Sequence, residues 1–146
     1  MADHLPLELE RFLPYRLSIL SNRVSQAIAR EYQDRFDLTM TEWRVMAVLA
    51  RFDGEGLSAR EVSTYTEMDK VAVSRALARL VAAKRVARRM HDGDRRRSVL
   101  RLTAAGWKIH DTVAPRAREY ERALLARLDP DEQAALERIL DKLAPV

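Results

Sequence analysis

Two short helices in quick succession, each with its own capping residue, constrain the fold of this chain more than any other feature of its sequence. Ser58 and Glu61 form a capping box, in which each side chain bonds the backbone of the other, and they predict a helix of about two turns. Asp69 is placed to cap a second helix, which we expect over residues 70–83. Only a tight turn fits between the two helices, so this segment predicts a helix-turn-helix unit.

Two strand-like segments follow directly, at residues 86–90 and 98–102. Between them lies Asp92-Gly93, a pair that favours the tight turn of a β-hairpin. The expected tip also holds three consecutive arginines at 95–97, which a folded core does not require. We therefore predict a mainly α fold with a small β-hairpin wing, which is a winged helix-turn-helix.

Long helices are predicted on both sides of this unit. Apolar residues recur at steps of three and four over about 14–35 and over 103–128, and a capped helix follows at 130–143. Pro115 lies inside the second of these helices and is expected to kink it. We divide one compact domain into an N-terminal dimerisation helix (1–38), the winged helix-turn-helix unit (39–102) and C-terminal dimerisation helices (103–146).

The apolar stripes of these terminal helices are too long for so small a central unit to bury. The simplest partner for them is a second copy of the same chain, because most soluble oligomers are symmetric homo-oligomers. We therefore predict a homodimer. The alternative is a monomer whose terminal helices fold back on the core.

Positive charge is concentrated in one part of the chain. Residues 70–101 carry eleven Lys or Arg and two Asp, a net charge of +9, whereas the rest of the chain carries 15 basic and 20 acidic residues, a net charge of −5. A strongly basic segment in an otherwise acidic protein indicates a surface that binds a polyanion. The alternative is a charged face that only meets solvent.

Several kinds of function are disfavoured by what the chain lacks. It has no cysteine, which excludes disulfides, zinc–thiolate sites and thiol redox sensing. His4, His91 and His110 lie far apart, and no metal-ligand spacing, phosphate loop or nucleophile–base pair is found. We expect no metal, no cofactor and no enzyme activity. With no apolar run of about 18 residues and no signal-peptide pattern, we expect a cytoplasmic protein with no membrane partner.

Three stretches of the sequence match the same known family. They are Thr41-Glu-Trp-Arg-Val45, Met68-Asp-Lys-Val-Ala-Val-Ser-Arg75, and Asp94-Arg-Arg96 followed by Leu102-Thr-Ala-Ala-Gly106. In this order and spacing, the chain resembles the MarR family of bacterial regulators over nearly its whole length. The resemblance implies a dimeric winged helix-turn-helix repressor that binds a palindromic operator in double-stranded DNA. It also implies release by a small effector, often an aromatic acid.

One position departs from the family pattern. Members usually have glycine where the chain turns from the recognition helix into the first wing strand, and here that place is Lys84-Arg85. Arg85 in a left-handed conformation would cost about 1 kcal/mol. The sequence leaves open whether Arg85 strains this turn.

The side of helix 70–83 that faces away from its apolar residues predicts DNA contacts by Lys70, Val71, Ala72, Ser74, Arg75 and Arg79. Arg75 is our prediction for a base contact, since its fork fits two acceptors of guanine. Val71 or Ala72 can touch a thymine methyl group, while Ser74 and Lys70 suit phosphates. Arg79 suits either a base contact or a phosphate contact.

The wing supplies the other predicted contacts. Arg95, Arg96 and Arg97 are expected to lie along the duplex, because a narrow minor groove attracts arginine. By resemblance, Arg96 enters the groove, and Asp94 holds the wing arginine in place. A carboxylate two residues away can orient a guanidinium, which is a physical reason for the same role of Asp94.

A further short helix is predicted to start at a capping box of Thr39 with Glu42 and to end at Asp53-Gly54. The resemblance implies an effector site in a cleft between this helix and the helices expected at about 14–35 and 103–128. Arg16 or Arg23 would pair with a carboxylate there, and Trp43 or Trp107 would supply an aromatic wall. The alternative is that the arginines lie on the surface or at an interface and that Trp43 belongs to the core. The absence of cysteine argues against the peroxide-sensing branch of the family.

Two other functions compete with a DNA-binding regulator. An enzyme is disfavoured by the missing motifs, since Glu61, Asp69 and Asp94 all have local structural explanations. A winged-helix module that docks protein would keep the fold but would not need Arg75 or the arginines of the wing. The sequence leaves open the operator, the regulated genes and the effector. It also leaves open whether the protein represses or activates transcription.

Overall fold

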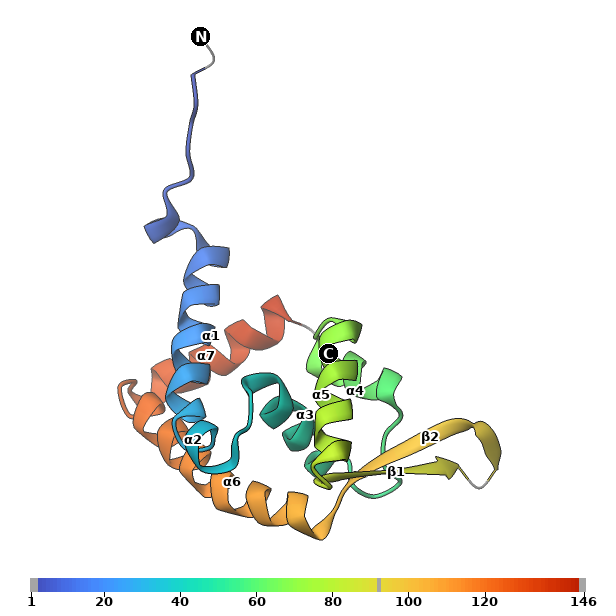
Figure 1. The fold of residues 1–146 in the computed structure, drawn as a ribbon. Coiled ribbons are helices and arrows are strands. Elements are labelled where there is room, and N and C mark those ends of the chain that lie inside the picture. The colour runs from blue at the N-terminus through green and yellow to red at the C-terminus, as the bar shows by residue number, and fades with distance from the viewer. Residues whose placement is uncertain (1–2, 92, 145–146) are drawn as a thin grey trace.

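The computed structural model describes residues 3–91 and 93–144, and for residues 91 and 94–97 it describes the backbone alone. Figure 1 shows the elements, which are mainly helical with one two-stranded antiparallel hairpin. In chain order they are η1 (Leu9–Arg11), α1 (Leu13–Ala29), α2 (Gln33–Phe36), α3 (Met40–Arg51), α4 (Ala59–Thr66), α5 (Lys70–Ala82), β1 (Val86–His91), β2 (Asp94–Leu102), α6 (Ala104–Leu125) and α7 (Pro130–Leu143). The predicted fold class, a winged helix-turn-helix between terminal helices, is confirmed.

The helices of the helix-turn-helix start where their capping residues predict. Ser58 Oγ accepts from the Glu61 backbone N–H at 3.2 Å, and Glu61 Oε1 accepts from the Ser58 N–H at 3.1 Å. Asp69 accepts from the Ala72 N–H at 3.2 Å and caps α5. These bonds satisfy backbone donors that have no partner inside the helix. Each cap therefore sets the start of its helix through a bond between residues only three apart in the sequence.

The first helix is shorter than predicted. It ends at Ala29 instead of near residue 35, and the chain turns before the one-turn helix α2. The turn places Tyr32 and Leu38 in the core, where they are 1% and 2% exposed. Burial of these two side chains therefore overrides the helical pattern that the sequence shows in this segment. Helix α6, by contrast, runs through Pro115 without interruption.

The hairpin, called the wing below, is longer than predicted because β2 starts at Asp94. The prediction that the arginines at 95–97 occupy a tip loop is wrong for the backbone, which belongs to β2 there. The register shifts between Met90, which pairs with Ser98, and His91, which pairs with Asp94. Such an irregularity bends and twists a strand locally.

The core lies where α3, α4, α5, α6 and the base of the wing meet. Its most deeply buried large side chains come from all of these elements and from the segment before α3, and include Tyr32, Leu38, Met46, Leu49, Val62, Leu77, Leu80, Leu100 and Val113. Leu57, just before α4, pairs with Leu100 through two backbone hydrogen bonds of 3.2 and 2.7 Å. This bridge attaches the wing to the helix-turn-helix.

The turn from α5 into the wing shows that Arg85 is not the residue with the left-handed conformation. The left-handed residue is Lys84, with φ of 60°. The Arg85 N–H donates to the Leu80 carbonyl at 2.9 Å and the Lys84 N–H to the Val81 carbonyl at 3.0 Å, which is the Schellman pattern of a helix end. Arg85 itself is not strained, and its guanidinium donates to the Phe36 carbonyl at 2.6 Å.

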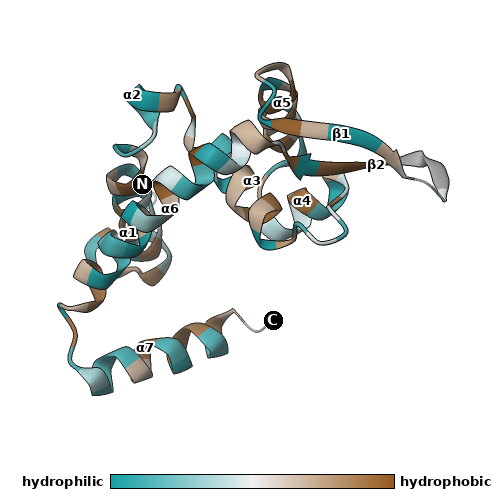
Figure 2. Cartoon of the chain, turned by 90° about the horizontal axis from the view of Figure 1, so that it is seen from below, coloured by the Kyte–Doolittle hydropathy of each residue, from teal (hydrophilic) through white to brown (hydrophobic). Residues whose placement is uncertain are grey.

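The terminal elements leave much apolar surface uncovered. In Figure 2, α7 lies apart from the rest of the chain, and none of its residues is buried. The exposed large apolar residues of the two ends are Leu5, Leu7, Leu9, Phe12, Leu13, Tyr15, Leu17, Leu20, Ile139, Leu140 and Leu143. Among the described residues, no helix is both long enough and apolar enough to cross a membrane.

Candidate nucleic-acid interface

Helix α5 has one buried side and one open side. Val73, Ala76, Leu77 and Leu80 are each at most 4% exposed and hold the helix against the core. The predicted contact residues Lys70, Val71, Ser74, Arg75 and Arg79 are exposed, and Ala72 is half-buried. An exposed, positively charged helix face fixed on a rigid core is what insertion into a major groove requires. The structure thus brings the six α5 residues together on one surface.

The wing adds to this surface only in part. The predicted contact side chains Asp94, Arg95, Arg96 and Arg97 lie outside the part of the chain for which side chains are described. On β1, Arg88 and Arg89 are both exposed. Arg101 of β2 donates to the Gly54 carbonyl at 2.6 Å, so this arginine secures the loop before α4.

Arg79 has a partner that the sequence did not suggest. Its Nε lies 2.9 Å from Oε1 of Glu42, at the start of α3. Glu42 is only 3% exposed, whereas the Arg79 side chain is 60% exposed. An ion pair therefore ties the open side of α5 to α3.

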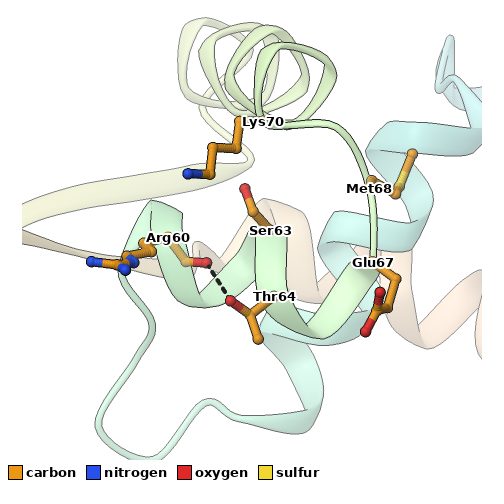
Figure 3. Close-up of a pocket in the computed structure, with 6 residues that line it drawn as sticks. All are labelled: Arg60, Ser63, Thr64, Glu67, Met68 and Lys70. Atoms are coloured by element: carbon orange, nitrogen blue, oxygen red, sulfur yellow. Dashed lines mark hydrogen bonds between the residues drawn. The ribbon is translucent and has the colours of Figure 1, made fainter.

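Sequence reasoning missed a second group of polar residues at the helix-turn-helix. Arg60, Ser63 and Thr64 of α4 and Lys70 of α5 line a hollow of about 440 Å³, together with Glu67 and Met68 of the turn. Figure 3 shows Lys70 reaching from the start of α5 over the side of α4 that carries Ser63. Two cations and two hydroxyl groups are suited to a phosphate, while Glu67 opposes an anion. The spacing of three and four between the α4 residues is the signal that identifies them as one helix face.

A separate cleft of about 350 Å³ lies between α1, α3 and α6. Its walls are mostly apolar, and its aromatic and charged members are Trp43, His110, Arg118, Tyr120 and Glu121. Of the predicted effector residues, Trp43 lines this cleft. Arg16 and Arg23 lie on α1, and neither they nor Trp107 is among the lining residues.

Aromatic rings form a stack beside this cleft. The Trp43 ring lies 5.6 Å from Tyr32 and 5.9 Å from His110, nearly parallel to both, and Trp107 meets His110 edge-on at 5.3 Å. His110 Nδ1 lies 3.1 Å from an Asp111 carboxylate oxygen. Burial raises the pKa of the Tyr32 phenol, and the nearby Arg44 charge opposes this shift. Trp107 is thus connected to the cleft through His110.

Metal binding has no support in the part of the chain that the structure describes. Among the side chains that the structure describes, no three of His, Asp or Glu lie close enough together to hold an ion. The hollow at the helix-turn-helix and the cleft between α1, α3 and α6 therefore offer a ligand separate arginine, lysine, histidine and hydroxyl groups.

Comparison with known proteins points to one family. The family model for the MarR family matches residues 36–97, which span α3, α4, α5, β1 and the start of β2. The chain is similar to the HTH-type transcriptional regulator BilQ of Clostridium symbiosum, with 28% identity over 88 residues. That match covers 60% of this chain and 61% of BilQ, which is less than two thirds of the relative's length.

Solved structures share the fold over nearly the whole chain. A MarR/EmrR family transcriptional regulator from Acinetobacter sp. ADP1 superposes with a TM-score of 0.82 at 28% identity, covering 94% of this chain and 95% of that one. BpsR of Bordetella bronchiseptica superposes with a TM-score of 0.81 at 23% identity, covering 97% and 99%. At that identity, the likeness to BpsR concerns the fold alone.

Proposed function

Because the chain belongs to the MarR family, we propose that it is a transcriptional regulator that binds double-stranded DNA in a sequence-specific manner. The observation that carries this proposal is the open face of α5, where basic residues and small residues share one side of a helix fixed on the core. Small residues between arginines let the helix come close to base edges. Arg75 reads guanine, Val71 or Ala72 meets a thymine methyl group, and Lys70 and Ser74 bind phosphates.

The wing completes the proposed interface. Arg95, Arg96 and Arg97 follow the duplex, with Arg96 in the minor groove and oriented by Asp94. The hollow formed by Arg60, Ser63 and Thr64 with Lys70 adds a phosphate contact on the α4 side. BpsR, which shares the fold, binds DNA, and this supports the same ligand here.

We propose that the protein acts as a homodimer. The uncovered apolar side chains lie on η1, α1 and α7, with Leu13, Leu17 and Leu20 between 45% and 55% exposed along one stripe of α1. A second copy that covers these stripes places two α5 helices side by side. Two such helices bind half-sites about one helical turn apart, which implies a palindromic operator. Repression is the mode of regulation that we assign.

An effector in the α1–α3–α6 cleft is the second part of the proposal. Trp43 offers an aromatic face, and His110 and Arg118 offer hydrogen-bond donors, so a planar aromatic acid fits the chemistry of the walls. Arg118 takes the role that the sequence assigned to Arg16 or Arg23. DNA binding by BpsR is regulated by 6-hydroxynicotinic acid, which supports this ligand class.

The DNA proposal is tested by selecting duplexes from a randomised pool at two salt concentrations and sequencing them. We expect an enriched palindrome, with affinity that falls steeply as salt rises because counterions are released. Arg75→Ala and Arg96→Ala are expected to abolish enrichment while the dimer stays intact in sedimentation. Weak, salt-sensitive binding without enrichment would instead favour a module whose partner is not DNA.

The effector proposal is tested separately by tryptophan fluorescence. We expect 6-hydroxynicotinic acid, used as a probe aromatic acid, to quench the Trp43 signal in a Trp107→Phe protein and to weaken DNA binding. Arg118→Ala is expected to lose the quenching, whereas Arg16→Ala, the matched exposed arginine on α1, is expected to keep it. Equal quenching in all three proteins would refute the placement.

A further inference from the structure

Glu42 is a charged residue buried among the core side chains, since it is only 3% exposed. Its two carboxylate oxygens have different surroundings. Oε2 accepts from the Thr39 N–H at 3.4 Å as part of the capping box of α3. Oε1 is buried and lies 2.9 Å from Arg79 Nε, but the pair lacks hydrogen-bond alignment, so the contact is an ion pair. A buried carboxylate is costly unless a cation stays beside it, so Glu42 restrains Arg79.

Arg79 has the opposite environment. Its side chain is 60% exposed, and it lies one turn along α5 from Arg75. The arginine fork carries donors on two terminal nitrogens in addition to Nε. Glu42 occupies the Nε side, so the terminal nitrogens remain for a further acceptor. Within the described residues, Glu42 is the only ion-pair partner of Arg79.

We propose that Glu42 is a positioning residue for DNA binding, which holds Arg79 in one orientation so that its terminal nitrogens bind a backbone phosphate. This inference rests on the proposed DNA-binding function. A phosphate is the expected acceptor because recognition helices read bases mainly with their N-terminal residues, and Arg79 lies in the C-terminal half of α5. An arginine that is already oriented loses less side-chain entropy when it binds.

A purely structural role for Glu42 makes a different prediction. If Glu42 only supports the fold through the capping box of α3, removing it lowers stability and DNA affinity whether or not Arg79 is present. If Glu42 acts through Arg79, its removal affects DNA affinity only while Arg79 is there, so a double-mutant cycle separates these two roles. If the ion pair only fastens α5 to α3, removing Arg79 leaves the salt dependence of binding unchanged, because no phosphate contact is lost.

The experiment measures the affinity of the full-length dimer for its selected duplex over a range of salt concentrations. Arg79→Ala is expected to reduce the slope of log affinity against log salt by about 1.8, since each lost phosphate contact contributes about 0.9 and a dimer loses two. Glu42→Gln keeps an oxygen for the Thr39 N–H. It is expected to weaken binding by about tenfold, from the ordering of two arginine side chains, with the slope unchanged. In the Arg79→Ala background, Glu42→Gln is expected to have no further effect.

Arg79→Lys tests the same idea without altering the buried carboxylate. Lysine keeps the charge but has no Nε group, so we expect the wild-type salt slope with weaker binding. Arg30→Ala, an exposed arginine at the end of α1, is the matched control and is expected to change neither quantity. An unchanged slope in Arg79→Ala, wild-type affinity in Arg79→Lys, or an equal loss from Glu42→Gln in both backgrounds overturns the inference.

Arg75→Ala separates this inference from the function on which it rests. If the wild-type protein binds its duplex and Arg75→Ala weakens it while the Arg79 variants behave as wild type, only the role of Glu42 and Arg79 fails. If the wild-type protein binds no duplex, the proposed function fails as well.

Discussion

Gly106 sits where the first turn of α6 presses against the turn between α5 and the wing. A Cβ atom added at this position would overlap the carbonyl oxygen of Arg85 and would stand 3.2 Å from both the carbonyl carbon of Arg85 and Cδ2 of Leu102. The helix start has little freedom to move away. The Thr103 N–H donates to the Arg85 carbonyl at 3.0 Å, and Thr103 Oγ1 donates to the Lys84 carbonyl at 2.7 Å.

We therefore predict that Gly106→Ala destabilises the fold. Overpacking against a fixed backbone costs about 1–3 kcal/mol, and weakening the Thr103 hydrogen bond costs about 1 kcal/mol more. Alanine gains back about 0.5–1 kcal/mol from its helix propensity. The expected net loss of unfolding free energy is about 2–3 kcal/mol, which lowers the melting temperature by roughly 7–10 °C for a chain of this size.

The assay is urea and thermal unfolding at one fixed protomer concentration, because a dimer's stability depends on concentration. Gly54→Ala is the matched control, since a Cβ there meets nothing within 4 Å, and we expect a change within about 0.5 kcal/mol. If Gly106→Ala proves as stable as Gly54→Ala, α6 does not pack closely enough against the Arg85 carbonyl to exclude a Cβ atom at residue 106.

Three further predictions concern single residues. Glu67 is left-handed with φ of 53°, so Glu67→Gly should raise the unfolding free energy by about 0.5–1 kcal/mol, and a lower urea midpoint would contradict this. Arg85→Ala removes the 2.6 Å bond to the Phe36 carbonyl and should cost about 1–2 kcal/mol by the same assay. Burial raises the pKa of Tyr32 above its ordinary value of 10.0, against the opposing charge of Arg44. The phenol of the unfolded chain therefore ionises at a lower pH than that of the folded chain. The stability that Tyr32 contributes is fully present below the unfolded pKa and is lost as pH rises through the folded pKa. Tyr32→Phe should not show this alkaline loss, and parallel pH profiles for the two proteins would contradict the prediction.

The features that sequence reasoning predicted well are those fixed by near neighbours in the chain. The capping boxes at Thr39, Ser58 and Asp129 each formed, because the bonding partners are only three residues apart. The buried and open sides of α5 followed from helical spacing, since residues three and four apart share a face whatever the helix packs against. The helix-turn-helix and the wing therefore needed no tertiary information.

The predicted end of the first helix was wrong because a distant contact decides it, and the conformation of the turn at Lys84-Arg85 was left open by the sequence. Helix α1 stops early because Tyr32 and Leu38 enter the core, and that burial depends on where α3 lies. The Schellman turn placed the left-handed conformation at Lys84, and it left Arg85 free to reach Phe36. Backbone hydrogen bonding at a helix end thus chose between two adjacent residues that the sequence pattern did not distinguish.

The sequence by itself determined that this chain forms a winged helix-turn-helix with a basic recognition helix, because caps, helical periodicity and charge are all local properties. Only the tertiary structure decided which side chains meet across helices. It paired Arg79 with the buried Glu42, placed Arg60 and Lys70 around one hollow, and assembled Trp43 and His110 on one cleft. The physical reason is that such contacts depend on the packing of whole elements against a shared core, and the spacing of residues along one element carries no record of that packing.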